Sequence, residues 1–233
     1  MVRHVVRTDY SYLTSQGKKH MHAAIIAILL GLVFLIVPIY GIFIAAGLAL
    51  FGVHQISRWS FYFKGASGER KVSKAIGRLN NSYFLFDDIV LYPHTGNIDH
   101  ILLGPNGIFV IETKNYSGVI RCIGDSWYQA GSPDTGGRKI DSISLQAKRN
   151  ASMLNEFLRS HIIGNFIGRL FVKPIIVFSN DSMTLIEKNP TVVSTSTGKL
   201  AKLVKKSDTG QYFSQWELER ITQVIMEKRN QAN

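Results

Sequence analysis

Asp99, Glu112 and Lys114 are the residues whose types and spacing are best suited to chemistry. If the segment around them folds as a hairpin, Asp99 faces Glu112, and directly opposed residues have Cβ atoms ~5 Å apart. Lys114 lies two residues beyond Glu112 and projects from the same face of the strand. Two facing carboxylates repel unless a positive charge lies between them. A divalent metal ion would satisfy both, and oxygen ligands favour Mg²⁺ or Mn²⁺ over zinc.

A metal ion held in this way is suited to phosphodiester cleavage. It binds a phosphate oxygen and lowers the pKa of an attacking water, while a nearby lysine stabilises the charge that develops. The structural alternative is an Asp/Glu pair neutralised by Lys114 as an ion-pair cluster at the end of a sheet. Glu-x-Lys alone is a common sequence, so these three residues leave both interpretations open.

The element that must position these residues is a hairpin with Gly104-Pro105-Asn106-Gly107 at its turn. Pro presets one φ, and Gly and Asn tolerate the other conformations of a tight turn. With the two glycines flanking the turn, Leu103 pairs with Ile108. Apolar residues occupy both faces of the two runs, which predicts a sheet covered by helices on both sides.

Glu69 is a further candidate because it continues the inward stripe of a predicted helix. Val72, Ile76 and Leu79 recur at helical spacing, and Glu69 lies three residues before Val72. We interpret the preceding segment 65–68, Gly-Ala-Ser-Gly, as a short linker. The alternative role of Glu69 is to complement the helix dipole in the first turn.

A long helix is predicted from about Ser142 to His161. Its apolar stripe consists of Ala147, Ala151, Leu154 and Leu158, and the adjoining ridge of Gln146, Asn150 and Met153. Gln146 is therefore a possible further member of the site. His100 alternates away from Asp99, so we expect it to pack behind the site.

The remaining pattern predicts an α/β sandwich, in the order helix, three strands, helix, strand, strand, helix. Strands are expected at 83–92, 170–179 and 191–195, a loop at 130–139, and a possible strand extension at 117–127. Pro174 argues for a sheet edge or a bulge at its position. Ser214-Gln215-Trp216-Glu217 predicts a capping box at the start of the last helix.

The sequence from Asp99 to Asn115, together with Gly68-Glu69 upstream, resembles the NERD (nuclease-related) domain. That family is similar to the PD-(D/E)xK superfamily, which has the restriction-endonuclease-like fold. The similarity extends over about residues 65–179. It implies Asp99 and Glu112 as metal ligands, Lys114 as the catalytic lysine, Glu69 as the acidic residue of the first helix, and Gln146 as a helix glutamine of the site. The expected cofactor is Mg²⁺ or Mn²⁺, and the expected partner is nucleic acid, DNA in preference to RNA.

A membrane segment is indicated by the 31 residues from Ala23 to Val53, which include no charged residue. One helix of that length measures roughly 46 Å against a hydrocarbon core of ~30 Å. Pro38 and Gly41 lie near the middle, so a hairpin with halves at about 21–37 and 39–57 is the alternative to one tilted span. A cleaved signal peptide lacks a suitable small-x-small site here.

Positive charge on both flanks favours the hairpin, with both ends in the cytoplasm. The flanking cations are Arg3, Arg7, Lys18 and Lys19 before the segment, and Arg58, Lys64, Arg70, Lys71 and Lys74 after it. The expected divisions are a basic cytoplasmic segment at 1–22, a transmembrane segment at 23–57, a nuclease-like core at 65–180 and a completing segment at 181–233. The lipid bilayer is thus an expected partner, at a bacterial-type inner membrane with the soluble domain facing the cytoplasm.

The bulk composition fits this organisation. The chain has 233 residues, 45% of them hydrophobic, and a formal net charge of +11, which suits a polyanionic partner or an anionic membrane surface. Cys122 is the single cysteine, which excludes disulfides within the chain and cysteine-rich zinc sites.

Two other patterns carry less weight. Ser196-Thr197-Gly198-Lys199 lacks the rest of a phosphate-binding Walker motif. The lysines at 199, 202, 205 and 206 either follow a phosphate backbone or form a solvated helix face.

The sequence therefore predicts a membrane-anchored, metal-dependent nuclease. The alternative is a non-catalytic, membrane-tethered module of the same fold that binds nucleic acid or protein.

Overall fold

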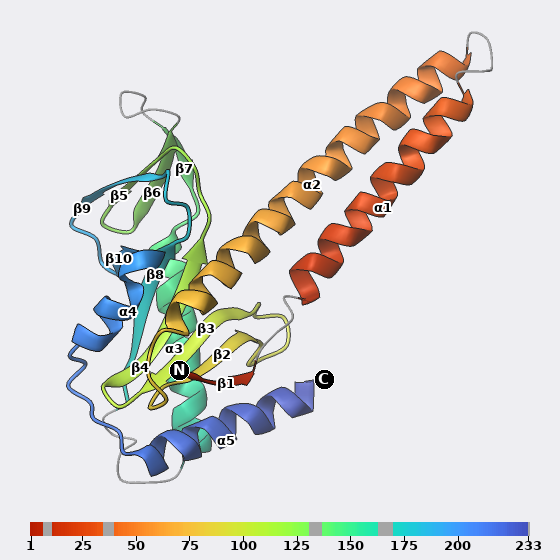
Figure 1. Cartoon of the computed structure of the whole chain (residues 1–233). Helices are drawn as coiled ribbons and strands as arrows, with labels where there is room; N and C mark the ends of the chain where they lie inside the picture. Colours follow the sequence, from red (N-terminus) through yellow and green to blue (C-terminus); the bar gives the residue numbers. More distant parts are fainter. Residues whose placement is uncertain (7–10, 35–39, 131–136, 163–169, 233) are drawn as a thin grey trace. The chain divides into compact units, whose positions relative to one another are not determined.

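The computed structural model describes residues 1–6, 11–34, 40–130, 137–162 and 170–232, which divide into two compact units (Figure 1). Unit 1 comprises Met1–Thr8 and Gly68–Asn233, and unit 2 comprises Asp9–Ser67. The N-terminal strand therefore belongs to the same unit as the predicted site, although unit 2 separates them in the sequence.

Unit 1 contains a mixed sheet of six strands among the described residues, in the order β1-β2-β3-β4-β8-β10. The strands are β1 (Arg3–Val6), β2 (Phe84–Ile89), β3 (Ile98–Gly104), β4 (Gly107–Lys114), β8 (Val172–Phe178) and β10 (Val193–Ser196). β2, β3 and β4 are antiparallel, while β4, β8 and β10 run parallel. Parallel strands end at the same edge of a sheet, so Lys114, Phe178 and Ser196 lie in one row.

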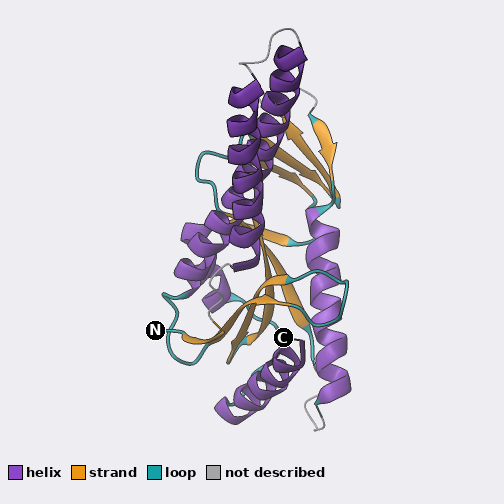
Figure 2. Cartoon of the chain, turned by 90° about the vertical axis from the view of Figure 1, so that its right-hand side faces the viewer, coloured by secondary structure: helices purple, strands orange, loops and turns teal. Residues whose placement is uncertain are grey.

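Helices cover both faces of this sheet, as the apolar pattern of the hairpin predicted (Figure 2). One core lies under α3 (Ile143–His161) and α5 (Gln215–Ala232) and includes Phe86, Ile101 and Val110. The opposite core lies under the end of α2 (Tyr40–Ile76) and α4 (Thr197–Lys206) and includes Leu102 and Phe109. The predicted α/β sandwich is confirmed.

A second sheet, of four strands in the part of the chain that is described, has the order β7-β6-β5-β9. Its strands are β5 (Val119–Ile123), β6 (Ser126–Ala130), β7 (Arg138–Ile140) and β9 (Thr184–Lys188). The predicted strand extension at 117–127 is wrong, because Gly118, with φ 77°, and Gly124, with φ 59°, redirect the chain. The predicted loop at 130–139 is also wrong at 130, which belongs to β6, and at 138–139, which belong to β7, while 131–136 lie outside the described residues.

Other boundaries follow the sequence closely. Ser142 caps α3, with its hydroxyl accepting from the backbone N–H of Leu145 at 3.2 Å. The predicted capping box is confirmed: the Glu217 carboxylate accepts from the Ser214 backbone N–H at 2.7 Å, and the Ser214 hydroxyl accepts from the Glu217 backbone N–H at 3.3 Å. Pairing of β8 with β10 begins at Ile175, so Pro174 has a neighbouring strand only on the β4 side.

The predicted linker at 65–68 is wrong, because these residues continue α2. Gly68 is needed for packing rather than for a turn. A Cβ at this position would lie 2.6 Å from the Ser179 hydroxyl oxygen and 3.1 Å from the Asn115 Cβ. Glycine therefore lets the helix approach the edge of the sheet at which β4 and β8 end.

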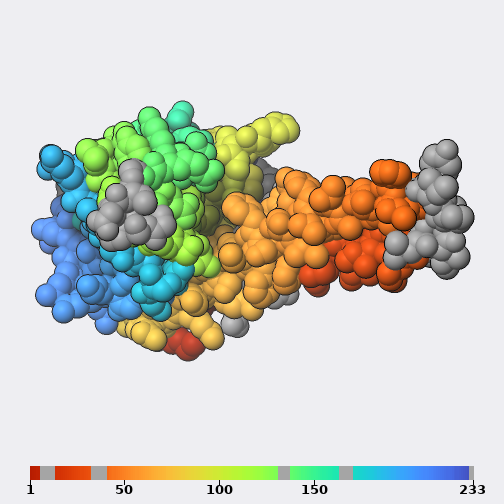
Figure 3. Space-filling view, turned by 90° about the horizontal axis from the view of Figure 1, so that it is seen from above, coloured from red at the N-terminus to blue at the C-terminus, as the bar shows by residue number. Residues whose placement is uncertain are grey.

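Unit 2 consists of α1 (Ser11–Phe34) and the first part of α2, which lie side by side (Figure 3) and run antiparallel (Figure 1). Gly31 lies against Leu48, Gly52 lies against Ile28, and the rings of His20 and Tyr62 stack with centroids 5.5 Å apart. Of the helices in the described ranges, one, over Gly41–Ile76, is long and apolar enough to cross a membrane. Pro38, where the sequence places a turn, lies outside the described residues.

Candidate active site

The hairpin has the predicted register. Leu103 pairs with Ile108 and Gly104 with Gly107, so Pro105 and Asn106 form the turn. Asp99 is the second residue of β3, and its Oδ2 accepts a hydrogen bond from the backbone N–H of Thr113 at 2.7 Å. This bond fixes the Asp99 carboxylate beside the end of β4.

Glu112 and Lys114 form a tight ion pair on β4. The Lys114 Nζ donates to Glu112 Oε1 at 2.7 Å and to Gln146 Oε1 at 3.0 Å. The Glu112 side chain is 1% exposed, and its Oε2 accepts from Asn150 Nδ2 at 3.1 Å. Lys114 and Glu112 therefore each have one partner on β4 and one on α3, and these bonds give both side chains a defined orientation.

Gln146 joins this cluster, as the sequence predicted, from the second turn of α3. Asn150 is a residue that the candidate set missed. It lies four residues after Gln146, so the two project from the same helix face. This spacing could have identified Asn150 from the sequence, because Asn150 lies on the same predicted helix ridge as Gln146.

Glu69 lies on α2 and is buried, with 9% of its surface exposed. Burial raises its pKa to about 8, and the charges of Asp88, Glu112 and Asp87 add to the increase. Within the described ranges, no hydrogen-bond donor or cation pairs with its carboxylate. The charge of Lys114 offsets only part of this increase, so Glu69 brings a third acidic group to the site with a pKa that stays raised.

The pKa values of Asp99 and Lys114 are also shifted by the neighbouring carboxylates. Burial and the charges of Glu112 and Glu69 hold the pKa of Asp99 well above its usual range. Burial lowers the pKa of Lys114, but the charges of Glu112 and Asp99 outweigh it, and the net pKa is raised. Lys114 therefore remains an ammonium ion at neutral pH.

A buried hydrogen-bonded chain supports this region from behind. The Ser73 hydroxyl donates to Asp87 Oδ2 at 3.0 Å, and Asp87 Oδ1 lies 2.7 Å from His100 Nδ1. Because Ser73 is one turn after Glu69 on α2, the chain links that helix to β2 and β3. His100 is fully buried, which confirms the prediction that it packs behind the site.

The donor set has the chemistry of a site for a hard divalent cation. Glu69, Asp99 and Glu112 all supply carboxylate oxygens. Burial, and after it the negative charge of the neighbouring carboxylates, raises the pKa of Glu69 and of Asp99, and a bound cation would relieve that negative charge. Mg²⁺ is commonly bound by one or two carboxylates together with waters and substrate phosphates. Among the residues that the structure describes, no three His, Cys, Asp or Glu side chains stand in metal-binding geometry.

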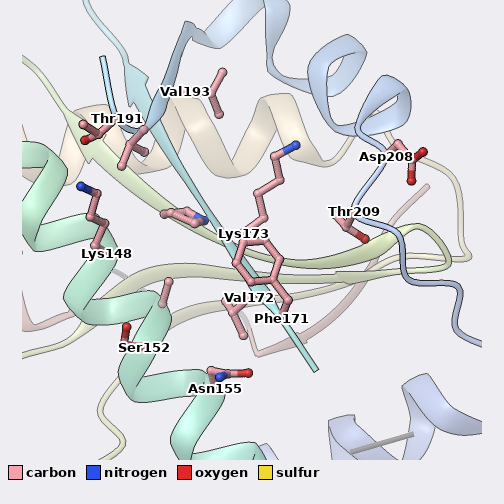
Figure 4. A pocket seen from close by; sticks show the side chains of 13 residues that line it. Lys148, Ser152, Asn155, Phe171, Val172, Lys173, Thr191, Val193, Asp208 and Thr209 are labelled. Carbon is pink, nitrogen blue, oxygen red and sulfur yellow. The ribbon is translucent and has the colours of Figure 1, made fainter. Parts of the chain in front are cut away.

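A cavity of about 530 Å³ in unit 1 lies apart from this cluster and includes none of its residues (Figure 4). Lys148 and Ser152 of α3 line one side, and Lys173 of β8 projects between them and Thr209. Lys148 Nζ donates to both carboxylate oxygens of Asp125, each at 3.0 Å. The polar groups of the cavity are thus separate from the carboxylate cluster.

Comparison with known proteins identifies the region that contains the cluster. Residues 64–179 match the sequence model of a family described as the nuclease-related domain, NERD. Over 70 residues the chain is 39% identical to an uncharacterized protein of Bacillus anthracis, in an alignment that covers 28% of this chain and 31% of that protein. No solved structure matches. All five predicted site residues lie inside the matched region, whereas α4 and α5 follow it.

Proposed function

Because residues 64–179 belong to the NERD family of nuclease-related domains, we propose that this chain is a metal-dependent nuclease that hydrolyses phosphodiester bonds of nucleic acid. The observation that carries the proposal is the cluster in which Lys114 bonds Glu112 and Gln146 beside Asp99 and Glu69. The alternative of a purely structural ion pair explains Glu112 and Lys114. It does not explain why two further carboxylates with raised pKa values adjoin them.

Asp99 and Glu112 are the residues that would hold the cation, with Glu69 as a third acidic group. When bound, Mg²⁺ or Mn²⁺ lowers the pKa of an attacking water and polarises the phosphate. Asp99 is preset for this role because its other oxygen is anchored by the Thr113 amide. Electrostatic catalysis requires charged groups that are already held in a fixed orientation, as the Asp99 carboxylate is.

Lys114 stabilises the negative charge that develops on the phosphate oxygens. Its raised pKa keeps the amine protonated, so it acts as a positive charge and not as the base that takes a proton from water. Gln146 and Glu112 hold the ammonium group at the end of β4. Asn150 keeps Glu112 from rotating away.

The experiment that tests this proposal uses the purified full chain in a non-ionic detergent. Plasmid DNA and a structured RNA are incubated with Mg²⁺, with Mn²⁺ and with a chelator. We expect cleavage only with a divalent ion, and its loss in Asp99→Ala. Binding without cleavage in either metal, or cleavage that survives Asp99→Ala, would contradict the nuclease assignment and favour a non-catalytic binding module.

We also propose that unit 2 anchors the chain in a membrane with both of its ends on one side. β1 precedes unit 2 and β2 follows it, yet the two strands pair in parallel within the sheet that carries the site. A chain that leaves and rejoins one sheet crosses a membrane an even number of times. This pairing supports a hairpin of α1 and α2 over a single span, and the basic flanks support a cytoplasmic orientation.

Cysteine labelling tests this topology. Lys18→Cys and Lys64→Cys place exposed thiols on the two flanks, and buried Cys122 gives the background in the parent chain. In intact cells an impermeant maleimide should label neither position, and in inverted membrane vesicles it should label both. Labelling of the two thiols from opposite sides would contradict the hairpin.

A further inference from the structure

α4 begins at the row of residues that ends the parallel strands and runs back along the sheet, because Asn106 of the β3–β4 turn donates to the carbonyls of Val204 at 2.7 Å and Ser207 at 3.0 Å. Lys114 of β4 pairs with Phe178 of β8, and Phe178 pairs with Ser196 of β10. Neighbouring strands are about 4.8 Å apart, so Ser196 lies roughly 10 Å across the sheet from Lys114. α4 begins at the next residue, Thr197, and therefore starts at the same edge of the sheet as the candidate active site.

Contacts along this edge connect the site with the helix. The backbone N–H of Ser179 donates to the Lys114 carbonyl at 3.0 Å, and the Thr197 hydroxyl donates to the Phe178 carbonyl at 3.4 Å. Between them, the exposed Lys71 of α2 donates to the Ser179 carbonyl at 3.4 Å. A positive charge thus stands on the path from Lys114 to α4.

α4 itself is strongly one-sided. Leu200 and Val204 are buried against the sheet, while Lys199, Lys202 and Lys206 are exposed on the opposite face. Their spacing of three and four residues places them along one face of the helix. No ion pair involves any of these three in the part of the chain that the structure describes, so their charges are available to a partner.

We propose that Lys199, Lys202 and Lys206 bind the sugar-phosphate backbone of nucleic acid along a path that leaves the active-site edge at Lys199 and follows α4 toward the β3–β4 turn. The inference rests on the proposed nuclease function and extends it to a helix beyond the matched family region, which ends at residue 179. From Lys199 to Lys206 the helix rises about 10 Å, enough to follow about three phosphates at 3.4 Å per strand residue. An anionic lipid surface would also attract lysines, but α4 begins, with Lys199 in its first turn, at the edge of the sheet that carries Lys114, and this favours nucleic acid.

Binding without cleavage separates this inference from the proposed function. The full chain, in non-ionic detergent with a chelator, is titrated against a fluorescent DNA duplex between 50 and 200 mM salt. Each phosphate contact contributes about 0.9 to the slope of log affinity against log salt, so three contacts contribute about 2.7. Over this range, wild-type affinity should fall about 40-fold more than that of a variant with all three lysines changed to Gln.

Matched variants control for net charge. Changing Arg138, Lys139 and Lys188, exposed on the second sheet, to Gln removes the same charge and should leave the wild-type slope. Changing Lys199, Lys202 and Lys206 to Arg keeps their positive charges and should give the wild-type slope of log affinity against log salt. A wild-type slope in the α4 Gln variant, or an equal loss in the second-sheet variant, would overturn the inference whether or not the chain cleaves DNA.

Amine labelling read by mass spectrometry distinguishes nucleic acid from lipid. With the full chain in nanodiscs, the duplex should protect the three α4 lysines equally in zwitterionic discs and in discs that contain phosphatidylglycerol. Protection by the anionic lipid, with none by DNA, would assign the lysines to the membrane surface and overturn the inference.

Discussion

Glu69→Gln should change the pH dependence of stability in the metal-free chain. The variant keeps the size of the side chain and removes its charge, in a position that is 9% exposed. Burial, together with the nearby carboxylates, raises the pKa of Glu69 from 4.5 to about 8. The folded chain therefore binds a proton between these values that the unfolded chain releases. Since stability falls wherever the folded state binds more protons, wild-type stability should decrease from pH 4.5 to pH 8.

The size of the effect follows from the shift. One pKa unit corresponds to 1.36 kcal/mol, so Glu69 lowers the free energy of unfolding at pH 8 by roughly 4–5 kcal/mol relative to pH 4.5. In a chain of this size 1 kcal/mol moves the Tm by about 2–4 °C. Glu69→Gln should thus match the wild type near pH 4.5 and melt on the order of 10 °C higher at pH 8.

The assay is thermal unfolding of the full chain in detergent with a chelator, at pH 4.5, 6.5 and 8. Glu156→Gln is the matched control, because Glu156 is exposed on α3. It should follow the wild type at every pH. A Tm difference between Glu69→Gln and wild type that stays constant with pH, or that shrinks as pH rises, would refute the reasoning.

Three further predictions concern the carboxylate cluster and the hairpin that carries it. Mg²⁺ at 100 times its Kd should stabilise the wild type by about 2.7 kcal/mol, and a thermal-shift assay should show that Asp99→Asn loses this gain. Asn150→Leu leaves one buried oxygen of Glu112 without its donor and should cost about 1–3 kcal/mol in denaturant unfolding, whereas an unchanged midpoint would argue against the bond. Gly104→Ala places a Cβ within clashing distance of the Tyr83 ring and should destabilise by about 1–3 kcal/mol, so an unchanged Tm would contradict this prediction.

The hairpin and its charged residues could be predicted because local chemistry determines them. The Gly-Pro-Asn-Gly turn sets the register, and the register decides which side chains share a face. Apolar residues on both faces then require helices on both sides, which the structure contains. The same local logic located the capping residues Ser142 and Ser214.

The failures arose where long-range packing decides the conformation. A glycine at position 68 suggests a linker from the sequence alone, yet Gly68 lies inside α2. It is glycine because the helix approaches Ser179 too closely for any side chain. β1 carries no local signal that it pairs with a strand about 80 residues later. The buried chain of Ser73, Asp87 and His100 likewise joins three elements whose proximity only the fold determines.

The single-turnover rate of DNA cleavage by Lys114→Met tests the central claim most directly. Lys148→Met is the matched control, because Lys148 is also ion-paired, to Asp125, but lies outside the carboxylate cluster. With Mg²⁺ and saturating enzyme, the account predicts that Lys114→Met lowers the rate at least 100-fold, which corresponds to about 2.7 kcal/mol of transition-state stabilisation, while Lys148→Met cleaves as fast as the wild type. Equal rates for Lys114→Met and wild type would contradict the assignment of this cluster as the active site.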